Sequence, residues 1–243
     1  MKICKLFFTI YVCVFSMFVH AQEKESFYRD SVIVVTYNNT NYLSQVKTTR
    51  LMKLIIDKDV SYFFISNPDF KIEEEGKIPS IIKYNDSNKL LFNRPMMPKY
   101  DKYTYFSDSL YPMKWHLTGK VELINGRVGH EATTFFRGRY FTAFYDPNIP
   151  FNNGPMKFGG LPGMIIRFYD KDRIFYYDLH NITREPRTFK VNKINLGGDF
   201  QTFLNIFPDW DRKRNEKAHA NQSVDPNCPE CGVKIVSYSI EIY

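Results

Sequence analysis

The chain has 243 residues, of which 44% are hydrophobic and 17% aromatic, and its 33 basic and 26 acidic residues give a formal net charge of +7. Basic residues are mixed with acidic ones and no nucleic-acid-binding motif is present, so the sequence argues against a nucleic-acid partner. The basic excess suits plain solubility, with peripheral contact to an anionic membrane as the alternative. The aromatic content favours β-structure with large buried side chains.

The first 21 residues have the pattern of a secretory signal peptide. A basic start is followed by the apolar run 6–19 and by Ala21 at the expected cleavage point. This run is short for a transmembrane helix, although an uncleaved anchor is the alternative. We therefore expect residues 1–21 to be removed and residues 22–243 to form a single β-rich domain. Its expected location is the periplasm or the outer surface of a Gram-negative cell.

The first half of the mature chain contains short apolar runs that predict strands. These runs are 32–37, 51–56, 60–66, 80–84 and 89–92. The second and third runs are separated only by Asp57-Lys58-Asp59, which predicts a hairpin. Residues 67–105 contain four prolines and are the least regular part of the chain. A long irregular segment is unusual in a compact domain unless it covers something, so we expect a flap there.

Residues 113–124 alternate most clearly between apolar and polar side chains. The apolar face carries Trp115, Leu117, Val121 and Leu123. Asn125-Gly126 follows, and this dipeptide is the strongest short signal for a hairpin turn. With that turn, the predicted cross-strand pairs are Leu123–Val128, Val121–His130, Gly119–Ala132 and, on the outer face, Lys120–Glu131. The register predicts that the apolar face and His130 are buried.

Further strands and a helix are predicted in the second half of the chain. The strands are 139–145, 164–169, 173–179, 187–194 and 233–243. Residues 200–207 have helical spacing, with Asp199 as the cap and Pro208 as the end, and 209–220 are compatible with a second, solvated helix. The whole predicts a mainly β fold: a strongly curved antiparallel sheet or incomplete barrel with one or two helices near the C-terminus. A two-sheet β-sandwich is the alternative.

A bend rich in glycine and proline lies between two of these strands. Residues 153–163 contain four glycines and two prolines, and an apolar strand follows directly. Such a segment is rigid and lets two backbones pass closely. Close packing is therefore the plain interpretation, and a ligand or partner contact at the bend is the alternative.

The hexapeptide Gly160-Leu161-Pro162-Gly163-Met164-Ile165 resembles the signature of the GLPGLI family, with Met in place of the fifth-position Leu. Other matching positions are Trp115, Lys120, Ile124, Gly126, Ala132, 136–139, 143–145, Ile149-Pro150, Gly154-Pro155 and Lys157-Phe158. The resemblance covers roughly 115–180 well and 32–66 loosely. It departs at His130 and Phe144, where the family often has Cys and Trp. It implies an exported Bacteroidetes protein with a β-rich fold and no established biochemical activity.

Cys228-Pro229-Glu230-Cys231 holds the two cysteines of the expected mature chain. Three interpretations stay open. A local disulfide needs only the oxidising compartment that export provides. A zinc site would need two further ligands, such as His219 and an acid. A redox site is disfavoured because the motif enters a predicted strand and not a helix.

The remaining candidate binding residues come from the bend, the hairpin and the 137–139 turn. They are Gly160, Leu161, Pro162, Gly163, Arg137, Arg139, Trp115 and His130. The two arginines flank a turn next to aromatic residues, an arrangement that suits an anionic ligand, with solvated turn residues as the plain interpretation. No nucleophile elbow, phosphate loop or clustered-histidine motif is present, so we assign no catalytic residues and expect no cofactor.

These features predict an exported cell-envelope protein that binds a ligand or a protein and does not catalyse a reaction. A curved, aromatic-rich sheet suits a hydrophobic or lipidic ligand, or another envelope protein, in its concave mouth. Two alternatives stay open. One is a metal or redox protein centred on Cys228 and Cys231. The other is a hydrolase with an unrecognised arrangement, for which His130 with Glu131 or Asp146 is the first candidate.

Overall fold

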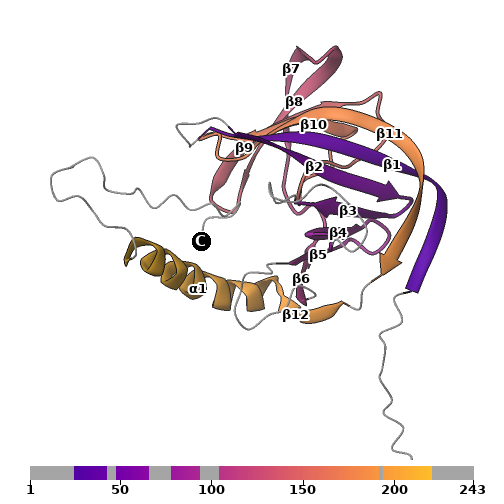
Figure 1. Cartoon of the computed structure of the whole chain (residues 1–243). Helices are drawn as coiled ribbons and strands as arrows, with labels where there is room; N and C mark the ends of the chain where they lie inside the picture. Colours follow the sequence, from indigo (N-terminus) through magenta and orange to yellow (C-terminus); the bar gives the residue numbers. More distant parts are fainter. Residues whose placement is uncertain (1–24, 43–47, 66–77, 94–103, 192–193, 221–243) are drawn as a thin grey trace, which may run out of the picture.

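The computed structural model describes residues 25–42, 48–65, 78–93, 104–191 and 194–220. In these residues, twelve strands form one strongly curved sheet, and a helix lies beside one end of it (Figure 1). The strands are β1 (Glu25–Asn41), β2 (Thr48–Asp57), β3 (Val60–Phe64), β4 (Ile81–Tyr84), β5 (Lys89–Asn93), β6 (Thr104–Ser109), β7 (His116–Ile124), β8 (Arg127–Phe136), β9 (Arg139–Asp146), β10 (Met164–Asp170), β11 (Tyr176–Val191) and β12 (Asn195–Asp199). The helix is α1 (Phe200–Ala220).

The sheet has the strand order β12-β6-β5-β4-β3-β2-β1-β11-β10-β9-β8-β7. Its neighbouring strands are antiparallel except for β12 and β6, which are parallel. The end strands β12 and β7 are not paired with each other, so the described sheet is open and not a closed barrel. The prediction of a mainly β, curved antiparallel sheet with a helix near the C-terminus is confirmed.

Four strands differ from the sequence prediction. β1 extends beyond the predicted run 32–37 at both ends. β6 and β12 were not predicted, because β6 follows a proline-rich stretch and β12 contains Gly197-Gly198. β11 is one strand of 16 residues, where a break had been expected. It contains Pro186, which is tolerated because β11 pairs with β10 only through residues 176–178 and beyond them has β1 on one side alone. β4 and β5 lie inside the sheet, so residues 78–93 are not part of a flap.

The β7–β8 hairpin confirms most of the predicted register. Val121 lies opposite His130, and Leu123 lies opposite Val128. The Gly119–Ala132 pair is wrong: Ala132 pairs with Leu117, because β7 carries an irregularity between residues 117 and 121. Gly119 has φ of +78°, a conformation that suits glycine at such a bulge. The Lys120–Glu131 contact is confirmed as an ion pair of 3.0 Å.

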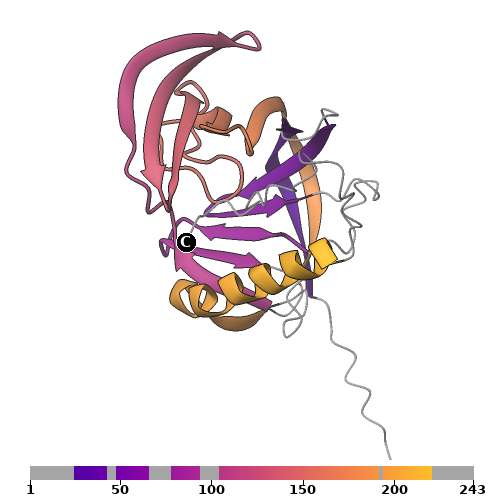
Figure 2. The ribbon, with the colours of Figure 1, turned by 90° about the vertical axis from the view of Figure 1, so that its left-hand side faces the viewer.

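The predicted burial of the apolar face of β7 is wrong. Leu117, Val121 and Leu123 are 53%, 52% and 73% exposed. The hairpin arches away from strands β2–β6 (Figure 2). Among the described elements, only β8 has extensive contacts with β7, so no described element covers this face. His130, one strand further in, is half-buried.

The hydrophobic core lies against the inner face of the sheet and includes the bend before β10. Phe158 of the bend is fully buried, with ring centroids 4.8 Å from Phe141 and 4.0 Å from Phe168. From α1, Phe203 packs on Phe92 at 4.9 Å and on Phe106 at 5.4 Å. The helix therefore closes the end of the core that β5 and β6 line.

Helix α1 begins as predicted and ends later than predicted. Asp199 caps it, because its Oδ1 accepts hydrogen bonds from the backbone N–H and the hydroxyl of Thr202 at 2.8 and 2.7 Å. The expected break at Pro208 is wrong: the helix continues through it as one element. Beyond the proline, Asp209 forms ion pairs with Arg212 and Lys213, one helical turn away. No helix in the described part of the chain is long and apolar enough to cross a membrane.

Candidate functional site

The glycine- and proline-rich bend is held from below by a buried lysine on β4. Lys83 Nζ donates hydrogen bonds to Asn153 Oδ1 at 2.8 Å, to the Gly154 carbonyl at 2.8 Å and to the Phe158 carbonyl at 2.9 Å. Its side chain is fully buried, and burial holds the pKa of Lys83 well below its ordinary value. Three N–H donors meet three fixed oxygens, so Lys83 determines the path of the bend.

A second set of contacts holds the bend from the side. Trp115 Nε1 donates to the Gly159 carbonyl at 2.9 Å. The ring of Tyr111 lies so close to Gly159 that a Cβ there would be 2.4 Å from it. Gly163 has φ of +152°, and a Cβ on it would lie 2.3 Å from the carbonyl oxygen of Asp146. These positions accept glycine alone, which explains the composition of the bend.

Two of the four candidate residues of the hexapeptide are accessible. Leu161 and Gly163 are buried, whereas Gly160 and Pro162 are exposed. Trp115 joins them through its bond to Gly159. The structure therefore brings Trp115 and the bend together, and it leaves a small exposed surface there.

Arg137 lies in a different cluster, between the β8–β9 turn, β6 and α1. Its guanidinium makes two hydrogen bonds to the carboxylate of Asp108, at 2.8 and 2.9 Å, and lies 3.4 Å from the ring centroid of Phe200. Lys157 Nζ is 3.4 Å from the same carboxylate and 3.9 Å from the ring centroid of Phe92. These contacts fix the start of α1 against the sheet.

Arg139 and His130 are separate from that cluster. Arg139 is buried and forms an ion pair of 3.2 Å with Asp170. Burial raises the pKa of the Asp170 carboxyl, and the positive charge of Arg139 opposes this effect. The ring centroid of His130 lies 5.6 Å from that of Tyr145 on the inner face of the hairpin. The candidate residues thus occupy four places in the fold: the bend with Trp115, the Arg137 cluster, the Arg139–Asp170 pair and the inner face of the hairpin at His130.

The residues of the hydrolase alternative do not face one another. His130 and Glu131 are neighbours in a strand, so their side chains point to opposite faces of the sheet. Glu131 pairs with Lys120, and Asp146 accepts from the amide of Asn148 and lies 3.5 Å from Arg127. Across the described residues, no group of three or more His, Cys, Asp or Glu is placed to hold a metal ion. Cys228 and Cys231 lie outside the described residues.

The comparison with protein families matches the part of the chain that contains the hairpin and the bend. A family model described as a protein of unknown function (Porph_ging) matches residues 113–167. This match spans β7 to β10 with the bend, where the sequence resembles the GLPGLI family, but it does not confirm that family name. No curated protein matches the chain.

Among solved structures, the chain is similar to PNGF-II in two crystal forms. The identities are 14% and 15%, and the TM-scores are 0.49 and 0.47. The alignments cover 72% and 73% of this chain, which spans about a third of the length of PNGF-II, 32% and 33%. A domain described as an outer membrane lipoprotein-sorting protein, from Vibrio parahaemolyticus, matches at 10% identity and a TM-score of 0.22, over 66% of this chain and 83% of that domain.

Two surfaces were missed by the sequence analysis. The first, the hairpin patch, consists of Leu117, Val121, Leu123 and Val128 on the inner face of β7 and β8. Alternation indicates which residues share a face, and it does not tell whether anything covers that face. The second, the aromatic row, consists of Phe135, Tyr140, Tyr169, Tyr176 and Tyr42 on the outer face.

A sequence signal for the aromatic row does exist. Each strand from β8 to β11 contains two consecutive aromatic residues. Four of these doublets are Phe135-Phe136, Tyr140-Phe141, Phe168-Tyr169 and Tyr176-Tyr177. Since neighbours in a strand face opposite sides, each of these four puts one ring into the core and one ring on the surface, whereas both rings of a fifth doublet, Phe144-Tyr145 on β9, are buried.

A small pocket lies between the β7–β8 turn and β11. It has a volume of about 180 Å³ and is lined by Ile124, Asn125, Arg127, Ile166, Leu179, His180, Asn181 and Ile182. Asn125 Nδ2 donates to the carbonyl of Leu179 at 3.3 Å, which holds the turn against β11. Pockets for drug-sized ligands have volumes of roughly 300–1,000 Å³, so this one accepts at most a side-chain-sized group.

Proposed function

We propose that the chain is an exported, non-enzymatic binding module of the bacterial envelope, and that it binds another envelope protein through the hairpin patch. One observation carries this proposal. Leu117, Val121, Leu123 and Val128 are 53%, 52%, 73% and 46% exposed, and they lie together on the end strand of an open sheet and its neighbour. Soluble proteins rarely leave such a group of aliphatic side chains in water without a partner.

The energy available at the hairpin patch is enough for a specific contact. Full burial of one Leu or Val side chain is worth about 1.5–3 kcal/mol, so covering four half-exposed ones contributes roughly 3–6 kcal/mol. An end strand also offers backbone N–H and C=O groups to an added strand. A polypeptide can use both features together, since its side chains alternate and its backbone pairs.

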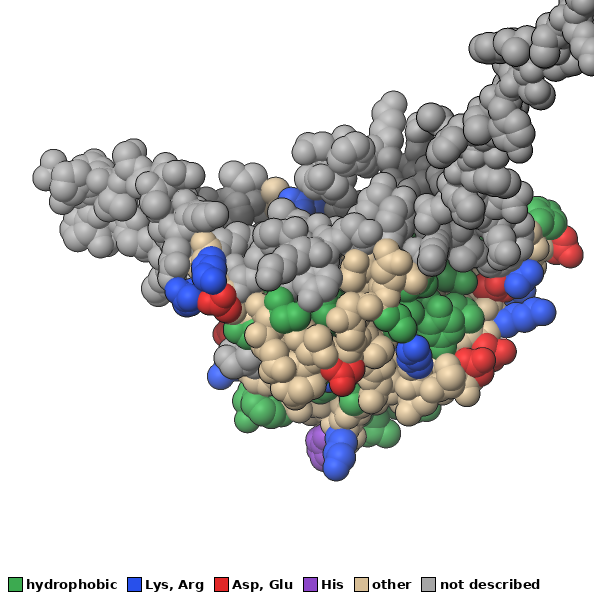
Figure 3. All heavy atoms as spheres, turned by 90° about the horizontal axis from the view of Figure 1, so that it is seen from below, with side chains coloured by type: hydrophobic (Ala, Val, Ile, Leu, Met, Phe, Trp, Pro, Cys, Tyr) green, Lys and Arg blue, Asp and Glu red, His purple; other side chains and the backbone are tan. Residues whose placement is uncertain are grey.

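A lipid is the less suitable occupant. A lipid chain needs an enclosed apolar cavity, and the pocket beside the β7–β8 turn, at about 180 Å³, is small for one. Seen from below, basic and acidic side chains are interspersed on the described part of that face (Figure 3). This face therefore does not present a uniformly basic surface to an anionic membrane.

Site-specific photo-crosslinking in intact cells tests the proposal. A photoreactive amino acid replaces Leu123 in one variant and Leu196 in a matched control, since Leu196 is 61% exposed on β12 at the other end of the sheet. We expect one discrete protein adduct from position 123 and none from 196. The adduct should disappear when Val121→Lys is added, while the folded content stays unchanged by circular dichroism.

Other outcomes would overturn the proposal. A lipid adduct would make the hairpin patch a lipid site. An adduct within the same chain, to residues 233–243, would mean that the C-terminal segment covers the patch itself. Equal amounts of protein adduct from positions 123 and 196 would show that any exposed position is crosslinked, without a specific binding site. Export is tested separately: the mass of the protein from the cell envelope should correspond to a chain that begins at Gln22, and an intact Met1 would contradict the expected cleavage.

A further inference from the structure

The aromatic row crosses the four strands β8 to β11, on the face that points away from the core, and ends at Tyr42, the residue after β1. Phe135 pairs with Tyr140, and Tyr169 pairs with Tyr176 and, on its other side, with Thr142. The partners of these rings in the doublets are in the core: Phe141, Phe168 and Tyr177 are 1%, 0% and 3% exposed. Because side chains alternate along a strand, Tyr140, Tyr169 and Tyr176 must point outward.

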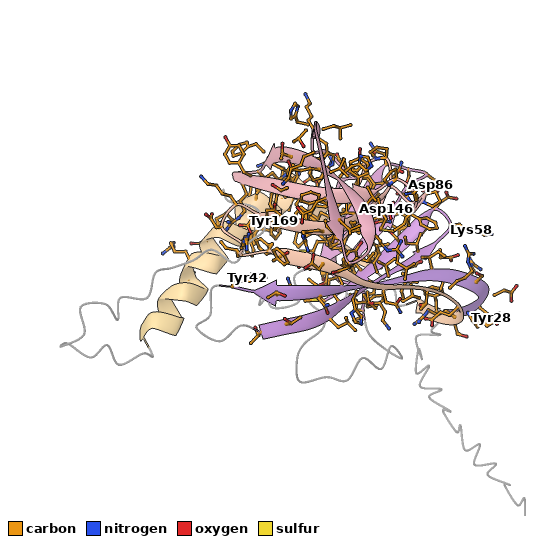
Figure 4. All side chains as sticks on the ribbon, turned by 90° about the horizontal axis from the view of Figure 1, so that it is seen from above. Tyr28, Tyr42, Lys58, Asp86, Asp146 and Tyr169 are labelled. Atoms are coloured by element: carbon orange, nitrogen blue, oxygen red, sulfur yellow. The ribbon has the colours of Figure 1, made fainter. Side chains whose placement is uncertain are left out.

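The rings contact one another in two groups, Phe135 with Tyr140 and Tyr169 with Tyr176 and Tyr42. Ring centroids are 4.7 Å apart for Phe135 and Tyr140, 5.7 Å for Tyr169 and Tyr176, and 5.2 Å for Tyr176 and Tyr42. Phe135, Tyr140 and Tyr42 are 60%, 64% and 40% exposed. Seen from above, Tyr42 and Tyr169 lie at the same end of the sheet, and Tyr28 lies at the opposite end (Figure 4).

The length of the row suits an extended ligand. The order β8-β9-β10-β11-β1 includes four gaps between strands, and at about 4.8 Å each the row is roughly 19 Å long. Thr133 and Thr142 pair between the rings and add two hydroxyl groups. The guanidinium of Arg173 lies 5.9 Å from the centroids of Tyr42, Tyr169 and Tyr176, at one end of the row.

The charges on the strands beside the row are matched by opposite charges, whereas Arg173 at one end of the row lies against the rings. Arg167 pairs with Asp178 at 2.6 Å and with Glu122 at 2.9 Å, and Lys120 pairs with Glu131 at 3.0 Å. Binding of a nucleic acid depends on cations that neutralise phosphates, and stacking rings alone do not replace them. The matched charges therefore favour a ligand without net charge.

We propose that the aromatic row binds a neutral saccharide chain. Sugar rings present polarised C–H groups, which are attracted to the negative faces of aromatic rings. Their hydroxyl groups match the phenol and threonine hydroxyls that lie between the rings. Tyrosine serves this purpose better than Leu or Val, because each ring joins an apolar body to a polar tip. An apolar lipid chain would leave those hydroxyls without partners.

The hydroxyl of Tyr176 is held by the neighbouring Asp178. Burial and this carboxylate, to which the hydroxyl donates a hydrogen bond, raise the pKa of Tyr176 to about 12. Tyr176 therefore stays protonated, and its oxygen can accept a hydrogen bond from a sugar hydroxyl. The row lies on a different face from the hairpin patch, so the inference does not depend on the proposed function.

Native gels that contain a dissolved polysaccharide, followed by calorimetric titration, test this inference. The probes are a panel of neutral glycans: soluble α- and β-glucans, xylan, mannan and chitin hexasaccharide. We expect at least one of them to slow the protein and to bind saturably. The Tyr140→Ala variant should weaken that binding at least tenfold, because it removes a ring from the middle of the exposed surface.

The matched control is Tyr28→Ala. Tyr28 is 58% exposed, close to the 64% of Tyr140, but it lies outside the row. This variant should bind like the original chain, and so should Leu123→Lys in the hairpin patch. No binding to any glycan of the panel overturns the inference, and so does an equal loss in the Tyr28 and Tyr140 variants. Tighter, salt-sensitive binding of oligo-dT than of any glycan would assign the row to single-stranded nucleic acid.

Discussion

Lys83 Nζ lies 2.8 Å from Asn153 Oδ1, and this bond joins β4 to the bend across 70 residues of sequence. The same Asn153 donates through Nδ2 to the hydroxyl of Ser61 at 2.9 Å, on the neighbouring strand β3. The bend is therefore tied to two strands of the other half of the sheet through one asparagine. Positions 83 and 153 determine the shape of the hexapeptide region more directly than its own exposed residues do.

Lys83→Met is expected to destabilise the fold. The substitution keeps the aliphatic stem and removes the donor from the Gly154 and Phe158 carbonyls, at a cost of about 1–3 kcal/mol for each unsatisfied group, while Asn153 Oδ1 keeps its bond from the Gly154 N–H. Removal of a buried amine offsets part of this cost, so we expect a net loss of about 2–4 kcal/mol in urea unfolding. Lys114→Met, at an exposed position, is the control. Equal midpoints for the two variants would contradict the role of Lys83.

The pH dependence of stability should show the lowered pKa of Lys83. This pKa is below 10.5 in the folded chain and near 10.5 in the unfolded chain, so unfolding takes up a proton between the two values. The free energy of unfolding should therefore rise with pH across that window, in the original chain relative to Lys83→Met. Urea unfolding of both proteins from pH 7 to 10.5 measures the difference. A difference that is constant with pH would show that the pKa of Lys83 is not lowered.

Buried tyrosines should act in the opposite direction at higher pH. Burial raises the pKa of Tyr62 and Tyr176 to about 12, and it raises those of Tyr37 and Tyr177 further. The unfolded chain then loses phenol protons near pH 10 while the folded chain keeps them, so stability should fall above that pH. Phenolate absorbance, followed together with circular dichroism, checks this. If all 17 tyrosines ionise near pH 10 with the fold intact, the burial is wrong.

Gly163→Ala should prevent normal folding. The new Cβ would lie 2.3 Å from the carbonyl oxygen of Asp146. This is a backbone atom, so one of the two chain segments would have to move at a large cost in free energy. Gly119→Ala is the control, since Gly119 also has positive φ, +78°, but has open space around it. We expect a cost of about 1 kcal/mol for the control and several times more for Gly163→Ala. Similar thermal midpoints for the two variants would show that the bend tolerates a side chain.

Phe203→Ala should detach helix α1 from the sheet. Phe203 is fully buried, and its ring touches Phe92, Phe106 and Phe207. Removal of such a ring costs about 3–5 kcal/mol. Phe135→Ala, at a ring that is 60% exposed, serves as the control and should change stability little. Hydrogen exchange would show faster exchange in α1 for the first variant alone. Unchanged protection of α1 would contradict this packing.

The sequence predicted the local structure correctly at two places, each of which is marked by one strong residue signal. Asn125-Gly126 fixed the hairpin register near the turn, and Asp199 fixed the start of α1. The register failed at Gly119, because counting by twos assumes a strand without a bulge. The sequence predicts that the helix ends at Pro208. The helix continues, because the buried Phe203 and Phe207 hold it against the sheet just before the proline.

Alternation of apolar and polar residues shows which side chains share a face of a strand, and it does not show which distant residues pack against that face. The apolar face of β7 has the pattern of a buried face, and it is exposed because no described element packs on it. Lys83 lies among apolar residues of a short strand, and nothing local indicates that three distant oxygens of the bend surround it. Tertiary placement, and not local preference, decides both cases.

The position of β1 constrains how the protein becomes folded. β1 is the first described strand, yet it lies between β2 and β11, and Thr36 contacts Asn181 across 145 residues. When the chain emerges from its N-terminus first, the apolar strand β1 therefore lacks one of its two neighbours until β11 has emerged. Folding should then be slow and late, since pairing between distant segments comes last. Under the proposed export, the protein would need shielding from aggregation until β11 has crossed the membrane.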